Sequence, residues 1–292
     1  MLSPYQSPED GLFGDRFKLS VTKPETRMYG RILVAIDGSF HAEAAARYAT
    51  HLAGACNAEL YVVYVGGSLA GRDSLDRLVW HAESEAIVVH AVVETGAIVS
   101  VIESIVRKED IDLAVASTMY LSTKTVTMDL MTALPCSVLA IRVAHLGKMT
   151  YLKKILVPVI GGAWADERAY LTSKLANVFD GTVTVLHVRT ISRSGFMGLT
   201  HEKKDITRAH AKRLVKDFVE ALSSHDVTVE TKAAIERDAT GAIITEAASG
   251  NYDLILLGAT RRDFLRRAIR GNTVERILRK APCDVVVWRP AL

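Results

Sequence analysis

The chain of 292 residues repeats its own pattern, and this repeat limits the folds open to it more than any other feature. Five apolar runs follow one another in each half, in the same order and at similar spacing. A Pro-Cys pair also occurs in the last run of both halves. The runs are residues 31–37, 59–65, 86–96, 112–118 and 134–142, and then 154–160, 182–188, 226–238, 253–259 and 281–289. A repeat of this kind indicates two copies of one domain.

The segments between the apolar runs have helical patterns. Residues 41–55 and 165–179 fill the first gap of each half, and residues 201–224 fill the next gap of the second half. Strands that are apolar throughout and alternate with helices predict a parallel sheet covered on both faces. The predicted fold class is therefore α/β, with two tandem open parallel five-stranded sheets of the Rossmann-like kind. Only residues 66–85 separate the second and third apolar runs of the first half, so the sequence predicts a short helix there.

The predicted organisation is an N-terminal arm followed by two domains. The arm covers residues 1–27 and contains three prolines, and the domains cover residues 28–145 and 151–292. No apolar stretch approaches the about 20 residues of a membrane-spanning helix, and the first residues lack the basic and apolar parts of a secretory signal. We therefore expect a cytoplasmic protein that does not enter a membrane.

The net charge and the cysteines exclude several function classes. A net charge of +3 is too small to indicate general nucleic-acid binding, so any basic site must be local. The three cysteines, Cys56, Cys136 and Cys283, form no C-x-x-C pair. This odd and sparse set predicts buried structural cysteines and disfavours a disulfide framework or a zinc site.

One segment of the second half has the pattern of an anion site. The stretch "GATRRDFLRRAIRGNTVERIL" begins with Gly258, at the end of an apolar run, and leads into a helix through Gly271 and Asn272. In a parallel sheet, ligands bind outside the carboxyl ends of the strands, where a glycine permits close approach and positive φ. Asn272 predicts an N-cap, and the free N–H groups of a helix start attract negative charge.

Five arginines lie between these glycines, opposed only by Asp263. They favour a nucleotide phosphate chain, but a solvated basic loop or a contact with an acidic protein partner stays open. Nucleic acid is disfavoured, because no aromatic platform or recognised nucleic-acid module accompanies the arginines.

With its two domains and this glycine spacing, the chain resembles a tandem universal stress protein over roughly residues 28–290. The stretch "GNTVERILRKAPCDVVV" is similar to the family's sequence from the last helix to the last strand. The resemblance implies a fold of the adenine nucleotide alpha hydrolase type. It also implies pairing of the last strands, either in a homodimer or between the two halves as a pseudo-dimer.

Family members that bind ATP carry the pattern G-x2-G-x9-G-[S/T] after the fourth strand, so the resemblance implies ATP as the ligand. In the second half Gly258 and Gly271 match the pattern, whereas Arg261 stands in place of the middle glycine. Asn272 and Thr273 stand where serine or threonine is expected. By analogy with the family, the base pocket would be lined by Pro158, Val159, Val188 and Leu257.

The family has an aspartate after its first strand, and the two halves differ at this position. The second half has Ile160 there, while the first half keeps Asp37 but has no glycine pattern after its fourth strand. The resemblance therefore implies that the first half is degenerate for ATP. Asp37 then serves either as a family-like nucleotide contact or as a turn residue before Gly38.

Catalysis finds little support in the sequence. It contains no G-x-x-x-x-G-K-[ST] loop, no G-x-S-x-G elbow and no H-E-x-x-H pair, and His187 is interpreted as a strand histidine. We expect a non-enzymatic stress-response regulator that binds ATP or another phosphate-bearing ligand through its second half. Two alternatives stay open: a nucleotide-free partner-binding scaffold and a weak ATP hydrolase.

Overall fold

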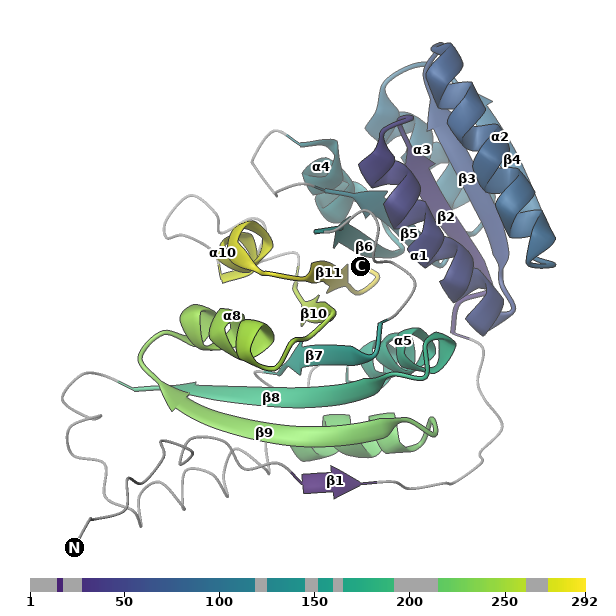
Figure 1. The fold of residues 1–292 in the computed structure, drawn as a ribbon. Helices are drawn as coiled ribbons and strands as arrows, with labels where there is room; N and C mark the ends of the chain where they lie inside the picture. The colour runs from purple at the N-terminus through teal and green to yellow at the C-terminus, as the bar shows by residue number, and fades with distance from the viewer. Residues whose placement is uncertain are drawn as a thin grey trace, which may run out of the picture.

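The computed structural model describes residues 15–17, 28–118, 125–144, 152–159, 165–191, 215–260 and 273–292. These residues form one open sheet of eleven strands with helices on both faces (Figure 1). The strand order is β1-β9-β8-β7-β10-β11-β6-β5-β2-β3-β4. The predicted α/β class, with parallel strands and alternating helices, is confirmed.

The first half contributes five parallel strands in the order β4-β3-β2-β5-β6. The strands are β2 (Arg31–Ile36), β3 (Glu59–Val65), β4 (Val89–Glu94), β5 (Leu113–Ser117) and β6 (Ser137–Arg142). Its helices are α1 (Phe40–Cys56), α2 (Leu69–Ser84), α3 (Ile98–Lys108) and α4 (Val126–Ala133).

The second half repeats this order as β9-β8-β7-β10-β11, again all parallel. The strands are β7 (Lys154–Pro158), β8 (Thr182–Thr190), β9 (Thr228–Glu236), β10 (Leu254–Gly258) and β11 (Asp284–Arg289). Its helices are α5 (Ala165–Val178), α8 (Ala239–Ser249) and α10 (Thr273–Lys280), together with helical residues 215–223. From the N-terminal arm, β1 (Asp15–Phe17) pairs antiparallel with β9.

The two five-stranded sheets are not separate, because β6 and β11 pair antiparallel and make one continuous sheet. The register runs from Val285 opposite Arg142 to Arg289 opposite Val138. Both strands are apolar and almost fully buried, so pairing satisfies two backbone edges that would otherwise be open. The halves therefore pack as an internal pseudo-dimer.

Two apolar layers lie on opposite faces of the sheet. The layer on one face contains buried residues of α1, α2, α5 and helical residues 215–223, and we call this the α5 face. The layer on the other face contains buried residues of α3, α4, α8 and α10, and we call it the α10 face. Alternate residues along each strand point to alternate faces, which assigns every strand side chain to one of the two layers.

The helix between β3 and β4 is longer than the sequence predicted. The expected short helix is wrong, because α2 has 16 residues and uses nearly the whole connection. The turn before it is tight: the Ser68 hydroxyl accepts from the Gly71 N–H at 3.1 Å, and the Tyr64 hydroxyl accepts from the Ser68 N–H at 2.8 Å. A capped start directly after the strand leaves room for four helical turns.

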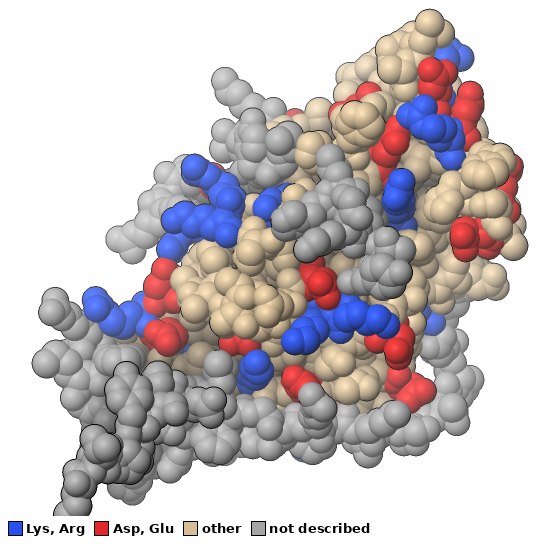
Figure 2. Space-filling view, viewed as in Figure 1, with Lys and Arg blue, Asp and Glu red and all other residues tan. Residues whose placement is uncertain are grey.

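Charged side chains are spread over the visible face of the molecule without a region of one sign (Figure 2). This fits a net charge of only +3. No helix of the described residues is both long and apolar enough to cross a membrane.

The prediction of buried structural cysteines is confirmed, since Cys56, Cys136 and Cys283 are free and buried. Burial raises the pKa of the Cys136 thiol to about 11 and that of the Cys283 thiol to about 12. The reactive thiolate is therefore scarce at neutral pH.

We expect iodoacetamide at about pH 8 to leave all three cysteines unmodified in the folded protein, because buried thiols with raised pKa values react slowly. Mass spectrometry of intact protein measures the labelling, and the chain unfolded in guanidinium, which should take up three labels, is the control. Rapid labelling of the folded protein would show that one of these thiols is accessible.

A buried carboxylate strengthens the junction between the halves. Asp284, at the start of β11, accepts hydrogen bonds from the Tyr48 hydroxyl of α1 at 2.6 Å and from the Ala144 N–H at 2.7 Å. Asp284 is only 7% exposed, so its charge depends on these donors. Burial, followed by the nearby Asp284 charge, raises the pKa of Tyr48 well above its ordinary value.

Replacing Tyr48 by Phe should reduce the free energy of unfolding by about 1.5–3 kcal/mol, because a hydrogen bond to a buried charged group is lost. Urea denaturation monitored by circular dichroism measures this. In an Asp284→Asn background the same substitution should cost less, and equal costs in both backgrounds would contradict the coupling.

Candidate functional site

The candidate site lies at the carboxyl ends of β8, β7 and β10, which are neighbours in the second half. The chain passes from β7 to β8 on one side, while β10 lies on the other side of β7. Strand order therefore reverses between β7 and β10, and this is where open α/β sheets leave a crevice for ligands. The position agrees with the region that the sequence indicated.

The structure places five of the predicted residues at this edge, but on both faces of the sheet. Val159 belongs to the layer of the α5 face. Gly258 lies two positions after Leu256 of the same layer, so strand alternation places it on that face too. Leu257 belongs to the α10 face, where Val188 packs and where alternation also places Pro158. The five residues therefore border the strand ends from two sides and do not form a single wall.

The remaining predicted residues belong to the start of the last helix. Arg261, Gly271 and Asn272 lie outside the described residues. Thr273 is the first residue of α10 and is exposed. Because α10 connects the carboxyl end of β10 to the amino end of β11, it begins at the same edge of the sheet as Gly258.

Helix α10 is fixed by apolar packing and by one ion pair. Val274, Ile277 and Leu278 are buried against the α10 face. On its outer side the Arg276 guanidinium donates two hydrogen bonds to Asp238, the N-cap residue of α8, at 2.6 and 3.2 Å. The hydrogen bond and charge of Arg276 lower the pKa of Asp238 below its usual range. These contacts hold the first turn of α10 beside the start of α8, at the carboxyl edge of the sheet.

The structure adds a residue that sequence reasoning missed: Arg168, in the first turns of α5. This arginine is only 7% exposed, and its guanidinium lies over the Phe218 ring, with 4.6 Å from Cζ to the ring centroid. Within the part of the chain that the structure describes, its Nε and Nη2 atoms have no hydrogen-bond partner. Burial lowers the pKa of Arg168 to about 10, so the side chain stays positively charged at neutral pH.

Arg168 also explains the glycine at the end of β10. A Cβ atom on Gly258 would lie 2.6 Å from Nη1 of Arg168, far inside the contact distance. Gly258 does not have the positive φ that the sequence suggested for it. The glycine therefore leaves space for the guanidinium, which would have to shift if residue 258 carried a side chain.

A signal for Arg168 does exist in the repeat. When Leu52-Ala53 of α1 is aligned with Leu175-Ala176 of α5, Arg168 falls opposite Ala45, which is completely buried. A charged residue at a position that its own repeat marks as core is the feature that could have indicated it. The first half has a small apolar residue there and so has no counterpart of this cation.

His187 of β8 has a structural contact at this edge. It is buried, and its Nδ1 lies 3.0 Å from the carbonyl oxygen of Val159, which accepts only if Nδ1 carries the proton. The Val159 N–H in turn donates to Leu186 O at 2.9 Å. These bonds extend the pairing of β7 and β8 by one residue, in agreement with the interpretation of His187 as a strand histidine.

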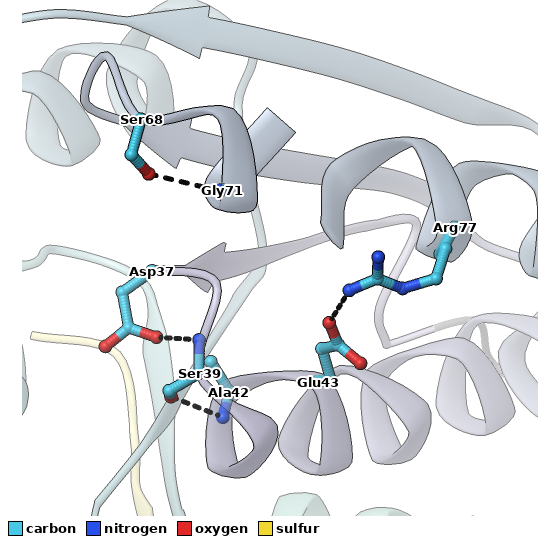
Figure 3. Close-up of polar contacts among 7 residues, drawn as sticks. All are labelled: Asp37, Ser39, Ala42, Glu43, Ser68, Gly71 and Arg77. Carbon is cyan, nitrogen blue, oxygen red and sulfur yellow. Dashed lines mark hydrogen bonds and ion pairs between the residues drawn. The ribbon is translucent and has the colours of Figure 1, made fainter. Parts of the chain in front are cut away.

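The equivalent edge of the first half is arranged differently (Figure 3). Asp37 accepts from the Ser39 N–H at 2.9 Å, and the Ser39 hydroxyl accepts from the Ala42 N–H at 3.2 Å as the N-cap of α1. Gly38 has a φ of +83°, and a Cβ there would lie 3.1 Å from backbone atoms of Gly71. The structure thus shows Asp37 as a turn residue.

The starts of α1 and α2 lie against each other at this point. An ion pair between Glu43 of α1 and Arg77 of α2 ties the two helices together, as Figure 3 shows. The backbone contact between Gly38 and Gly71 fills the space next to the Asp37 turn. This packing gives a physical reason to interpret the first half as degenerate.

Among the described residues, no three His, Cys, Asp or Glu side chains come together as a metal site requires. Two hollows have been located among the same residues. One, lined by Leu152, Tyr252 and Pro282, lies at the amino ends of the strands. The other, of about 390 Å³, follows α8 along β9. Neither is lined by a predicted pocket residue.

Comparison with known proteins identifies the relatives of the chain. A putative universal stress protein of Staphylococcus haemolyticus is 32% identical over 147 residues, which are 48% of this chain and 86% of that protein. A universal stress protein of Methanocaldococcus jannaschii is 26% identical over 140 residues, 46% of this chain and 81% of that protein. Each of these relatives therefore corresponds to about half of the chain.

A solved structure matches both halves together. The crystal structure of a universal stress protein from Archaeoglobus fulgidus superposes with a TM-score of 0.61 at 15% identity, and the match covers 91% of this chain and 98% of that one. The model of the universal stress protein family matches residues 28–71 and 152–289, together more than half of the chain. The chain therefore belongs to the universal stress protein family, as a tandem of two such domains.

Proposed function

We propose that the protein is a non-enzymatic stress-response regulator of the cytoplasm that binds ATP or another phosphate-bearing ligand through its second half. Family membership supports the stress-response role. One observation carries the ligand proposal: the exposed Gly258, at the end of β10, and the exposed Thr273, at the start of α10, stand at the same edge of the sheet. A glycine backbone and a helix start at one edge of a sheet are both suited to a phosphate group.

A regulatory rather than catalytic role is supported by the titratable groups at the two strand edges. His187 bonds the Val159 carbonyl within the β7–β8 pairing, and one Asp37 oxygen is bonded within a turn. Both groups therefore have structural partners. ATP would act as a bound signal whose occupancy changes the surface presented to a partner.

A nucleotide-free partner-binding scaffold is the second candidate, and an edge of the sheet that no described strand covers favours it. Strand β4 is the outermost strand of the first half, whereas the corresponding strand β9 is covered by β1. Large apolar side chains near β4 are exposed, with Trp80 at 71% and Val88 at 61%. An open strand edge with apolar neighbours can accept a strand from another chain.

Isothermal titration calorimetry of the full chain tests the ligand proposal. We expect ATP to bind with a Kd between about 1 μM and 1 mM, which corresponds to about −8 to −4 kcal/mol. Gly271→Arg should abolish this heat, because a large side chain would obstruct the phosphates. The first-half variant Asp37→Ala is the control and should bind like the wild type.

Two results would contradict the proposal. The absence of heat with ATP, ADP and AMP at millimolar concentration would exclude the nucleotide and favour the scaffold. Phosphate release from ATP above the buffer background, lost in the Gly271→Arg variant, would exclude the non-enzymatic role.

A further inference from the structure

The buried charge of Arg168 has no counter-charge among the described residues. A cation held in the interior is unfavourable unless an anion or several hydrogen bonds compensate it. Here the Phe218 ring supplies a cation–π contact, while Nε and Nη2 have no partner. The aromatic contact replaces only part of the lost hydration.

The neighbouring carboxylate does not fill this role. Glu167, the preceding residue, accepts hydrogen bonds from the Tyr29 hydroxyl at 3.1 Å and from the Ser137 hydroxyl at 2.5 Å. Both donors belong to the first half, so Glu167 is committed to the junction between the halves. The guanidinium of Arg168 is therefore left with donors that nothing else in the described structure uses.

The fold does not need an arginine at this position. The repeat has Ala45 there, and the buried face of α1 packs on its half of the sheet without a cation, since its Arg47 is exposed. A side chain at position 258, in contrast, would displace the guanidinium of Arg168. The second half thus carries a pair, Arg168 and Gly258, that gives the apo protein no evident stability.

The guanidinium borders the strand end at which the proposed ligand site lies. Its Nη1 atom occupies the space beside Gly258, the exposed residue that ends β10. Gly258 lies opposite Trp288 of β11 in register, and the Trp288 side chain belongs to the layer of the α5 face.

We propose that Arg168 is a ligand-binding residue that pairs with the anionic group of the bound molecule, a phosphate or pyrophosphate, at the end of β10. This inference rests on the proposed function and deepens it. Two parallel N–H donors of a guanidinium match two phosphate oxygens. Binding beside Nη1 would provide the counter-charge that the buried side chain lacks, and it would make the site selective for phosphorylated ligands over neutral nucleosides.

The test uses calorimetry with ATP, inorganic pyrophosphate and adenosine on the full chain and on Arg168→Met. The methionine keeps an unbranched side chain of similar length and removes the charge. We expect ATP and pyrophosphate to bind about ten- to a hundredfold more weakly, the effect of losing hydrogen bonds to a charged group, and adenosine to bind unchanged. Arg77→Met, an arginine of the first half paired with Glu43, is the matched control and should bind like the wild type.

A second readout separates a ligand-binding residue from a structural one. If Arg168 is held only for the ligand, the apo Arg168→Met protein should melt at the same or a higher temperature than the wild type, since an uncompensated buried charge is removed. The thermal shift produced by saturating pyrophosphate should be lost. A lower melting temperature with unchanged ligand affinity would overturn the proposal.

The outcomes also distinguish this inference from the proposed function. Wild-type protein that binds pyrophosphate but no nucleotide, with Arg168→Met binding neither, would support the inference, exclude ATP and leave another phosphate-bearing ligand as the proposed one. Equal binding of ATP by the wild type and by Arg168→Met would support the nucleotide proposal and contradict the inference. Binding of none of the three probes to the wild type would overturn both.

Gly258 provides an independent variant. Gly258→Ala places a methyl group where the guanidinium lies, so we expect it to weaken pyrophosphate binding about as much as Arg168→Met does. In the Arg168→Met background the same alanine should cost little more, because the two residues act as one unit. Fully additive losses would contradict the contact between them.

Discussion

The antiparallel pairing of β6 with β11 is the contact on which the rest of the structure depends. Each half of the chain is an open sheet with a buried apolar strand at its inner edge, and such an edge requires a partner. Because the two halves are copies, their inner edges can pair around a pseudo-two-fold axis, and the chain supplies its own second subunit. The junction then places the carboxyl ends of the two sets of strands in fixed relation.

Polar contacts at the junction show how closely the halves have become coupled. Asp284 of the second half accepts from Tyr48 of the first, and Glu167 accepts from Tyr29 and Ser137. Burial and the Glu167 charge raise the pKa of Tyr29, which therefore keeps its proton and remains a donor. Separation of the halves would leave buried acidic groups without donors, so neither half is expected to keep this interior alone.

The duplicated fold carries two different strand edges. In the first half, Asp37 closes a turn and the backbone of Gly38 lies against that of Gly71, so the helices meet over the strand ends. In the second half the core position of Ala45 is taken by Arg168, whose charge reaches the end of β10. One half has thus been closed by packing, and the other has gained a buried cation. The asymmetry agrees with a single ligand site in the chain.

The sequence alone determined the architecture, because the helical patterns, the apolar strands and the repeat of five apolar runs depend only on the order of the residues. It also located the edge at Gly258, since strand ends and helix starts have local signatures. The length of α2 was not predicted, because the helix is capped at Ser68 and only a short turn separates it from β3. Only the tertiary structure could show that Gly258 leaves space for Arg168, since these residues are 90 positions apart and meet through the packing of α5 on the sheet. A buried charge is hard to recognise in a sequence. Its unsatisfied hydrogen-bond donors can be identified only in the folded structure, where the neighbouring groups are known.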